Sequence, residues 1–141
     1  MDIRVSSRFW SSTFKIPEFA TSSILQLKFH KILPLRDEQT HRQFYASTSD
    51  KVFSSRDQLM RYLPKVFGEI QSNHNLSDLS ERRLAEGEVW ICSFGEGINL
   101  ENMISEKLLK QIKSSHMSLF YENYPLSEDA NPEGRFLVRR R

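Results

Sequence analysis

The segment from Gly87 to Tyr124 constrains the fold more than any other part of the chain. It contains a strand pattern, GEVWICSFG, a polar turn, a helix pattern, ISEKLLKQIKSSH, and a second strand pattern, MSLFYENY. In the first strand, apolar residues occupy both alternating sets: Val89 and Ile91 on one face, and Trp90, Cys92 and Phe94 on the other. This pattern is typical of a central strand, so we expect both of its faces to be covered.

Alternation predicts four further strands, at residues 3–10, 25–32, 42–48 and 117–123. Residues 33–42 are polar with one proline, which is typical of a surface loop. The stretch 126–141 is a polar, turn-rich tail with a short apolar group, and it is either loose or adds an edge strand.

The helices are indicated by capping residues and by apolar spacing. Ser55 and Gln58 form a capping box that opens an amphipathic helix over residues 55–72. Pro64 should kink that helix or break it near Tyr62. Three shorter helices are expected: one opened by Pro17, one over 77–86 closed by Gly87 in a left-handed cap, and one capped by Ser105 that runs to Ile112.

A chain of 141 residues without an internal repeat predicts one domain, residues 1–125, followed by the tail at 126–141. The order of elements mixes hairpin and crossover connections. This order predicts an α+β fold, with a mostly antiparallel sheet of four to five strands and two or three helices packed on one face.

The composition limits the compartment and the partners. The chain has one cysteine, which excludes an internal disulfide and favours a reducing, cytoplasmic location. No apolar run approaches the roughly 20 residues of a membrane span, and the N-terminus lacks the order of a signal peptide. The formal net charge is +2, and it would be about −1 without the last three arginines, so charge alone does not favour nucleic acid.

The sequence offers no catalytic, cofactor or metal motif. The histidines at 30, 41, 74 and 116 and Cys92 have no ligand spacing, so we expect no metal. Asp37, Glu38 and His41 lack a nearby nucleophile and are interpreted as a solvated loop. We interpret Cys92 as a small core residue. The segment 95–97, GEG, lacks the Lys-Ser or Lys-Thr of a phosphate loop and indicates a turn that needs positive φ.

Acidic and polar residues follow the last two strands and their connection. The candidate partner-binding residues are Glu96, Asn99, Glu101, Glu122, Tyr124, Glu128 and Asp129. If the strand ends lie together, these carboxylates form a patch that attracts a cationic partner. The alternative is that they serve solubility alone.

Several of these features together resemble a bacterial family of small α+β domains of unknown function. The resemblance rests on VSSRFWSSTF followed by Ile16, Pro17 and Glu18, on the helix at 55–72, and on VWICSFGEGINLENMISEKLLKQIKSSHMSLFYENY. The family usually has a tryptophan and a Lys-Gly turn after the first helix, and LQLKFHKILPLRDE has neither. Some of its members are immunity proteins of contact-dependent growth inhibition and related toxin systems. No catalytic residue is implied.

The resemblance implies a non-enzymatic immunity protein, an antitoxin that occludes the active site of a cognate toxin. A basic nuclease is the partner that an acidic patch would suit. The alternative is a nucleic-acid-binding regulator that uses the sheet face and the last three arginines. In that case Phe9, Trp10, Phe120 and Tyr121 would stack on bases. An enzyme ranks third, and we expect no small-molecule or membrane partner.

Overall fold

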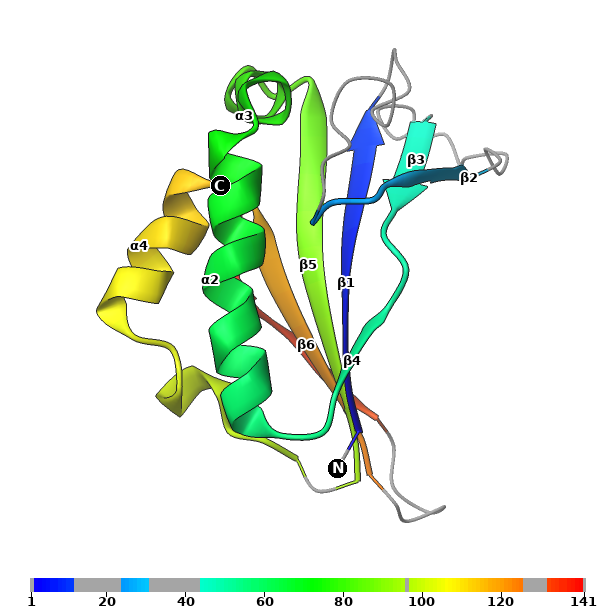
Figure 1. The fold of residues 1–141 in the computed structure, drawn as a ribbon, viewed down its shortest axis with the longest axis vertical. Helices are drawn as coiled ribbons and strands as arrows, with labels where there is room; N and C mark the ends of the chain where they lie inside the picture. Colours follow the sequence, from blue (N-terminus) through cyan, green and yellow to red (C-terminus); the bar gives the residue numbers. More distant parts are fainter. Residues whose placement is uncertain (1, 12–23, 31–43, 96, 126–131, 141) are drawn as a thin grey trace.

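The structure, a computed structural model, describes residues 2–11, 24–30, 44–95, 97–125 and 132–140 (Figure 1). Several predictions fall outside the described residues: the helix opened by Pro17, the loop at 33–42 with Asp37, Glu38 and His41, and the acidic residues Glu96, Glu128 and Asp129.

Within the described residues, seven strands form one sheet in the order β2-β3-β1-β5-β6-β7, and β4 pairs with β1 beside β3. The strands are β1 (Asp2–Ser11), β2 (Lys28–His30), β3 (Phe44–Ser47), β4 (Lys51–Phe53), β5 (Ala85–Phe94), β6 (Ser118–Tyr124) and β7 (Glu133–Val138). The pairing of β5 with β6 is parallel and the others are antiparallel. The predicted α+β class and mostly antiparallel sheet are confirmed. The predicted count of four to five strands is too low, because the short β4 and the edge strand β7 show little alternation.

The centre of the sheet is β1, which pairs with β5 along its whole length. On its other side, residues 8–11 pair with β3 and residues 3–5 pair with β4. Thr48 bridges the gap between these two strands. The Ser7 N–H donates to Thr48 Oγ1 at 2.9 Å, and the Thr48 N–H donates to the Ser7 carbonyl at 2.9 Å. β1 is therefore hydrogen-bonded on both sides at Ser7, although Thr48 lies between β3 and β4 and outside their regular pairing with β1.

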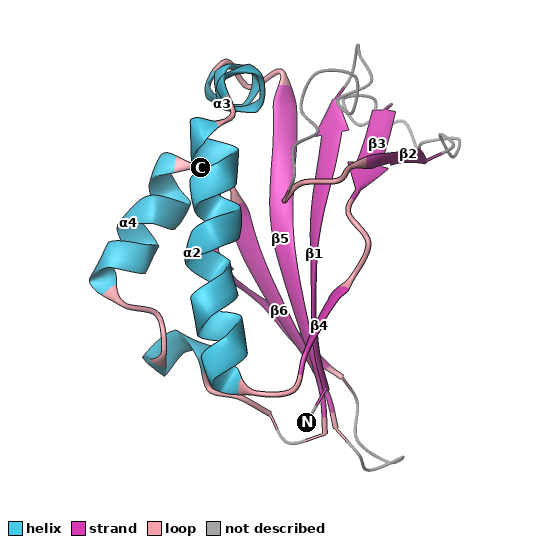
Figure 2. Cartoon of the chain, viewed as in Figure 1, coloured by secondary structure: helices cyan, strands magenta, loops and turns pink. Residues whose placement is uncertain are grey.

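The described α-helices lie on one side of the sheet (Figure 2). They are α2 (Arg56–Ser72), α3 (His74–Glu81) and α4 (Glu106–Ser114), and a short 3₁₀ helix, η2 (Leu100–Asn102), precedes α4. The two predicted N-caps, Ser55 and Ser105, are confirmed. The Gln58 N–H donates to Ser55 Oγ at 3.3 Å, and the Leu108 N–H donates to Ser105 Oγ at 3.1 Å. These caps satisfy N–H groups that have no partner inside the helix.

Pro64 lies inside α2, which continues through it as one helix from Arg56 to Ser72. The break near Tyr62, one of the two predicted outcomes, does not occur. Pro64 is exposed, so the missing bond to residue 60 lies on the solvent side of the helix. The Pro64 carbonyl accepts a hydrogen bond from Gln111 Nε2 at 3.0 Å, which ties α2 to α4.

The helix predicted over residues 77–86 begins and ends earlier, since α3 runs from His74 to Glu81. The Leu84 N–H donates to the Leu79 carbonyl at 2.9 Å, and Arg83 has a φ of 60°. This is the Schellman arrangement, in which the left-handed position is usually a glycine. The cap is therefore Arg83 rather than Gly87.

Gly87 lies inside β5, so its predicted role as a helix cap is wrong. A Cβ at this position would collide with the side chains of Met117 and Phe9. Close packing between neighbouring strands, and not a turn, requires the glycine here.

The core lies between the sheet and the helices. Its fully buried side chains include Ile3, Phe9 and Ile91 from the sheet and Leu63 and Phe67 from α2. The prediction that both faces of β5 are covered is wrong. No described helix covers Trp90, Cys92 and Phe94, and all three side chains are partly exposed. Their neighbours across the sheet, described below, shield them in part.

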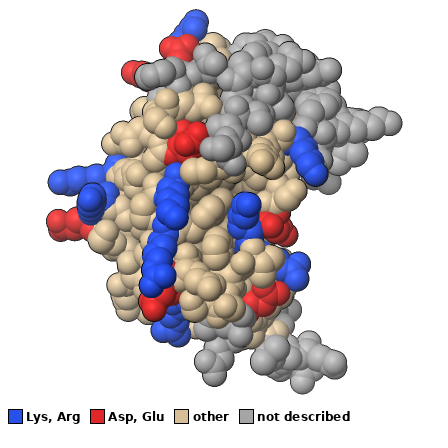
Figure 3. All heavy atoms as spheres, in the orientation of Figure 1, with Lys and Arg blue, Asp and Glu red and all other residues tan. Residues whose placement is uncertain are grey.

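The surface drawn in Figure 3 carries both charges, with positive and negative side chains interspersed. This distribution agrees with a net charge of only +2. None of the described helices combines the length and the apolar character that a bilayer span requires.

Candidate functional site

One face of the sheet has no described helix over it, and we call it the open face. On the three central strands its residues are Arg4, Ser6, Arg8 and Trp10 of β1, Glu86, Glu88, Trp90, Cys92 and Phe94 of β5, and Ser118, Phe120, Glu122 and Tyr124 of β6. Cross-strand register adds Tyr45 of β3 and Phe136 of β7. The rings are partly exposed. A continuous set of such rings indicates a binding surface.

A row of planar groups crosses four strands of the open face, and we call it the aromatic row. The ring centroids of Trp90 and Phe120 are 3.9 Å apart, and those of Phe120 and Phe136 are 4.9 Å apart. An arginine lies at each end. The guanidinium carbon of Arg8 is 4.1 Å from the Trp90 centroid, and that of Arg139 is 4.4 Å from the Phe136 centroid. Ring and cation–π contacts thus fix the row.

Two further ring pairs flank the aromatic row. Phe94 and Tyr124 stack with centroids 5.0 Å apart, and the guanidinium of Arg4 lies 5.0 Å from the Phe94 centroid. Trp10 and Tyr45 stack with centroids 5.5 Å apart. Both tryptophans of the chain therefore lie on the open face.

Carboxylates beside the row are engaged with their neighbours. Glu88 is 9% exposed, and its Oε2 accepts a hydrogen bond from Trp90 Nε1 at 2.6 Å. This bond orients the indole ring beneath the arginine. Near the other end of β1, Asp2 Oδ2 lies 3.3 Å from Arg4 Nη2.

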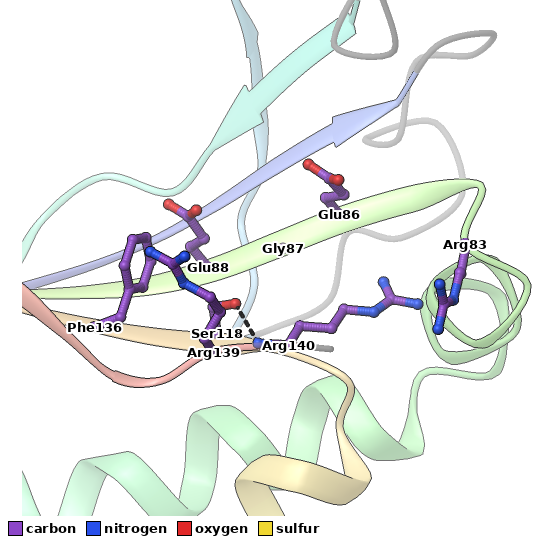
Figure 4. Close-up of a pocket in the computed structure, with 8 residues that line it drawn as sticks. All are labelled: Arg83, Glu86, Gly87, Glu88, Ser118, Phe136, Arg139 and Arg140. Carbon is purple, nitrogen blue, oxygen red and sulfur yellow. Dashed lines mark hydrogen bonds between the residues drawn. The ribbon is translucent and has the colours of Figure 1, made fainter. Parts of the chain in front are cut away.

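A cavity of about 430 Å³ lies at the end of the open face where β5 begins and β7 ends. It is lined by Arg83, Glu86, Gly87, Glu88, Ser118, Phe136, Arg139 and Arg140. The Arg140 N–H donates to Ser118 Oγ, and its Nη1 donates to the Ala85 carbonyl, both at 2.9 Å. Figure 4 shows its side chain extending toward Arg83. Burial lowers the pKa of Arg140, the charge of Arg83 lowers it further, and Glu86 raises it.

A second cavity, of about 630 Å³, lies between α4 and the end of β7. Its polar lining includes Lys113 and His116, and it shares Arg139 and Arg140 with the first cavity. The two cavities together bring five basic residues to one end of the molecule, which we call the basic end: Arg83, Lys113, His116, Arg139 and Arg140.

Cys92 lies on the open face, so its predicted place in the core is wrong. Burial raises the pKa of its thiol, and the charge of Glu122 raises it further. Arg8 lowers this pKa, Asp50 raises it, and Arg4 lowers it. The net increase keeps the thiol protonated at neutral pH, where it is a poor nucleophile.

The described members of the predicted partner-binding set lie in two places. Asn99 and Glu101 are exposed in the connection from β5 to α4. Glu101 Oε1 pairs with Arg135 Nε at 2.9 Å. The guanidinium of Arg135 lies 6.0 Å from the ring centroid of Tyr121, a buried residue of the covered face.

Glu122 and Tyr124 lie on the opposite side, on the open face. The Tyr124 hydroxyl donates to the Glu122 carboxylate, and this bond raises the pKa of Tyr124. Glu96, Glu128 and Asp129 lie outside the described residues. The described candidates therefore separate into two pairs on the two sides of the sheet.

Of the four aromatic residues proposed to stack on bases, two are placed on the open face and two are not. Trp10 and Phe120 lie there, partly exposed. Phe9 is 0% and Tyr121 4% exposed on the covered face, so they cannot stack on a ligand. The ring contacts of Trp90, Phe94, Tyr124 and Phe136 on the open face were not predicted from the sequence. Strand alternation already placed the first two on one face, but their apolar character indicated burial.

The remaining motifs are simple structural features. The predicted turn is confirmed at Gly95, which has a φ of 103°. His116 follows Ser115, the C-cap of α4, and has a φ of 57°. No group of three or more His, Cys, Asp and Glu side chains suited to a metal ion occurs within the described part of the chain. His41 and the side chains of His30 and His74 lie outside it.

These observations define an α+β protein whose sheet has one helix-covered face and one open face of aromatic rings and arginines. The chain matches no family model, no curated protein and no solved structure. The resemblance to the family that includes immunity proteins therefore stays a prediction, and the geometry of the open face is the basis for proposing a function.

Proposed function

We propose that this protein binds single-stranded nucleic acid on the open face, with bases stacked on its rings and phosphates held by its arginines. The observation that carries the proposal is the aromatic row, whose three rings have an arginine at each end. Every base has a π-face, so such a platform binds a strand with little sequence preference. Each stacked base contributes about 1–3 kcal/mol.

The spacing of the groups supports this ligand. Adjacent strands lie roughly 4.8 Å apart, so rings on successive strands offer repeated stacking positions across the sheet. Arg4, Arg8 and Arg139 are distributed around these rings. A guanidinium that stacks on a ring can still donate its N–H groups to a phosphate.

The mixed charge of the open face sets the expected strength of binding. Contacts from three arginines to phosphates predict a slope of log K against log salt of about −2. This modest salt dependence is compatible with the small net charge of +2. The proposal is for a non-enzymatic cytoplasmic protein, in keeping with the lone, protonated Cys92.

A protein partner is the second candidate, because tryptophan, tyrosine and arginine are also enriched at the centres of protein interfaces. The open face would then cover a toxin, as the immunity hypothesis requires. The observation that favours it is the same set of partly exposed rings. Binding to a partner protein without a steep salt dependence, together with failure to bind oligonucleotides, would select this candidate.

The test measures the affinity of the protein for a fluorescent oligothymidylate by anisotropy, at about 50 mM salt. Trp90→Leu and Phe120→Leu should each weaken binding by roughly tenfold or more, because each removes a stacking ring. Tyr62→Leu is the matched control, because this ring does not belong to the open face. Its centroid lies 5.0 Å from that of Phe53. Equal affinities for all four proteins would reject the proposal, provided that melting curves show each variant folded.

A further inference from the structure

We propose that the cavity at the basic end of the open face binds the terminal phosphate of a nucleic acid strand, which is a phosphate monoester. This inference rests on the proposed function and specifies where the end of the bound strand lies. Arg83 and Arg140 are the groups that would hold the phosphate, and Arg139 joins the cavity to the aromatic row.

The cavity and the aromatic row form one surface. Phe136 belongs to both, and it is 36% exposed. Arg139 lines the cavity while its guanidinium lies over the Phe136 ring. A terminal base beside Phe136 therefore places its phosphate toward the three arginines. The volume of about 430 Å³ accommodates a group of nucleotide size.

Two arginines that are distant in the sequence converge in the cavity. Arg83 comes from the end of α3, and Arg140 follows β7 (Figure 4). They are close enough to interact, because the charge of Arg83 helps to lower the pKa of Arg140. An anion between two guanidinium groups removes their repulsion and accepts charge-assisted hydrogen bonds from both. A phosphate monoester carries more charge at neutral pH than an internal phosphodiester, so it is the better ligand.

The backbone at Arg83 supports a role for its side chain. Its φ of 60° is the conformation that glycine adopts without steric cost. Arginine has no conformational advantage at this position, and its guanidinium lines the cavity.

The two glutamates of the cavity limit the negative charge that it can bind. Glu88 is held by the indole N–H of Trp90, and the charge of Glu86 partly offsets the lowering of the pKa of Arg140 by burial and by Arg83. Two carboxylates beside three arginines leave one net positive charge. The cavity therefore suits a single phosphate and disfavours a triphosphate.

The experiment compares oligothymidylates of one length with a 5′-phosphate, a 3′-phosphate or hydroxyls at both ends. The wild type should bind one phosphorylated form roughly tenfold more tightly than the hydroxyl form, the ratio typical of a charge-assisted contact. Arg83→Gly and Arg140→Met should reduce this ratio to about one and leave the affinity for the hydroxyl form nearly unchanged. Arg61→Gln, an exposed arginine of α2, is the control and should keep the ratio.

The preference should also depend on pH. The second pKa of a phosphate monoester is about 6, so the ratio should fall as the pH is lowered from about 7.5 to 5.5. Arg83→Gly fits the backbone of the cap, so its melting temperature should be no lower than that of the wild type, which separates lost binding from unfolding.

The outcomes distinguish the two proposals. If the hydroxyl oligonucleotide binds and neither phosphate strengthens binding, the terminal-phosphate inference is wrong while the proposed function stands. If no oligonucleotide binds, the proposed function is wrong. Adenosine monophosphate and adenosine are then the probes. Preferential binding of the monophosphate that Arg83→Gly abolishes would assign the cavity to a free nucleotide and overturn its assignment to a strand end.

Discussion

Neighbouring residues of the same strands build two different surfaces on the two faces of the sheet. On β1, Phe9 is fully buried beneath the helices, whereas the next residue, Trp10, is partly exposed and stacks on Tyr45. On β5, Ile91 is buried and Trp90 lies under an arginine. The covered face holds the fold by excluding water from apolar side chains. The open face holds planar and cationic groups in register and leaves them within reach of a ligand.

The largest expected difference between the faces is in stability. Phe9→Ala should lower the free energy of unfolding by about 3–5 kcal/mol, because it opens a cavity in the core. Trp10→Ala should lower it by only about 1 kcal/mol, the value of an aromatic pair at a partly exposed site. Urea denaturation measures both. Equal losses would contradict the division of the sheet into two faces.

A buried hydroxyl of the covered face gives the next largest effect. The Ile98 N–H donates to the Tyr121 hydroxyl at 3.1 Å, and this hydroxyl lies 2.9 Å from Ser93 Oγ. Since Ser93 donates to Asn123 Oδ1 at 2.9 Å, the Tyr121 hydroxyl donates to Ser93. Tyr121→Phe should lower the free energy of unfolding by about 1–3 kcal/mol without changing oligonucleotide affinity.

The matched control for that variant is Tyr124→Phe on the open face. Its hydroxyl bonds to Glu122 in a solvent-accessible position, so the free energy of unfolding should change by less than about 0.5 kcal/mol. Comparable destabilisation by the two variants would show that the buried hydrogen bonds of Tyr121 contribute little.

The arginines of the open face should affect binding rather than folding. Replacing both Arg8 and Arg139 by Gln should make the slope of log K against log salt less negative by about 1.4, since each phosphate contact contributes about 0.7. The slope comes from titrations at several salt concentrations. An unchanged slope would mean that these arginines hold only their rings.

A small stabilisation is expected at the end of α3. Arg83→Gly should raise the free energy of unfolding by about 0.5–1 kcal/mol, because glycine removes the steric cost of the left-handed conformation. His116→Gly, at the other left-handed helix end, should stabilise the fold by a similar amount. Only Arg83→Gly should alter the preference for terminal phosphates. A loss of stability in Arg83→Gly would show that the side chain supports the fold.

The smallest effect is the pH response of Cys92. Its pKa in the folded protein is raised above the ordinary value of 9.0, mainly by burial. Its stabilising contribution is therefore complete below about pH 9 and is lost as the pH rises through the folded pKa. Cys92→Ser should flatten the alkaline decline in stability, and alkylation of the native thiol at pH 8 should be slower than that of the unfolded chain. Equal alkylation rates would contradict the raised pKa.

The sequence was sufficient for the elements whose signals are local. Alternation predicted β1, β5 and β6, and capping residues predicted the starts of α2 and α4. Gly87 was misassigned as a cap because a glycine after a helix pattern has two explanations. Only the close approach of Met117, the residue before β6, and of Phe9 separates them.

The open face depends on register between distant strands, which no local pattern encodes. Apolar residues on both faces of β5 indicated two covering layers. The structure instead places Trp90 beside Phe120 and Arg8, so that side chains of the sheet itself shield the ring. The cavity likewise requires the end of α3 to meet the end of β7. The carboxylate patch was inferred from the positions of the strand ends alone. Glu101 and Glu122 in fact lie on opposite sides of the sheet.

The most direct test of the central claim uses the two tryptophans, which both lie on the open face. Their fluorescence is recorded while a single-stranded oligothymidylate is added at about 50 mM and then about 200 mM salt. The account predicts saturable quenching that persists in Trp10→Phe, which leaves Trp90 as the reporter, and that weakens at the higher salt. Unchanged fluorescence at both salt concentrations would contradict binding of nucleic acid by this face.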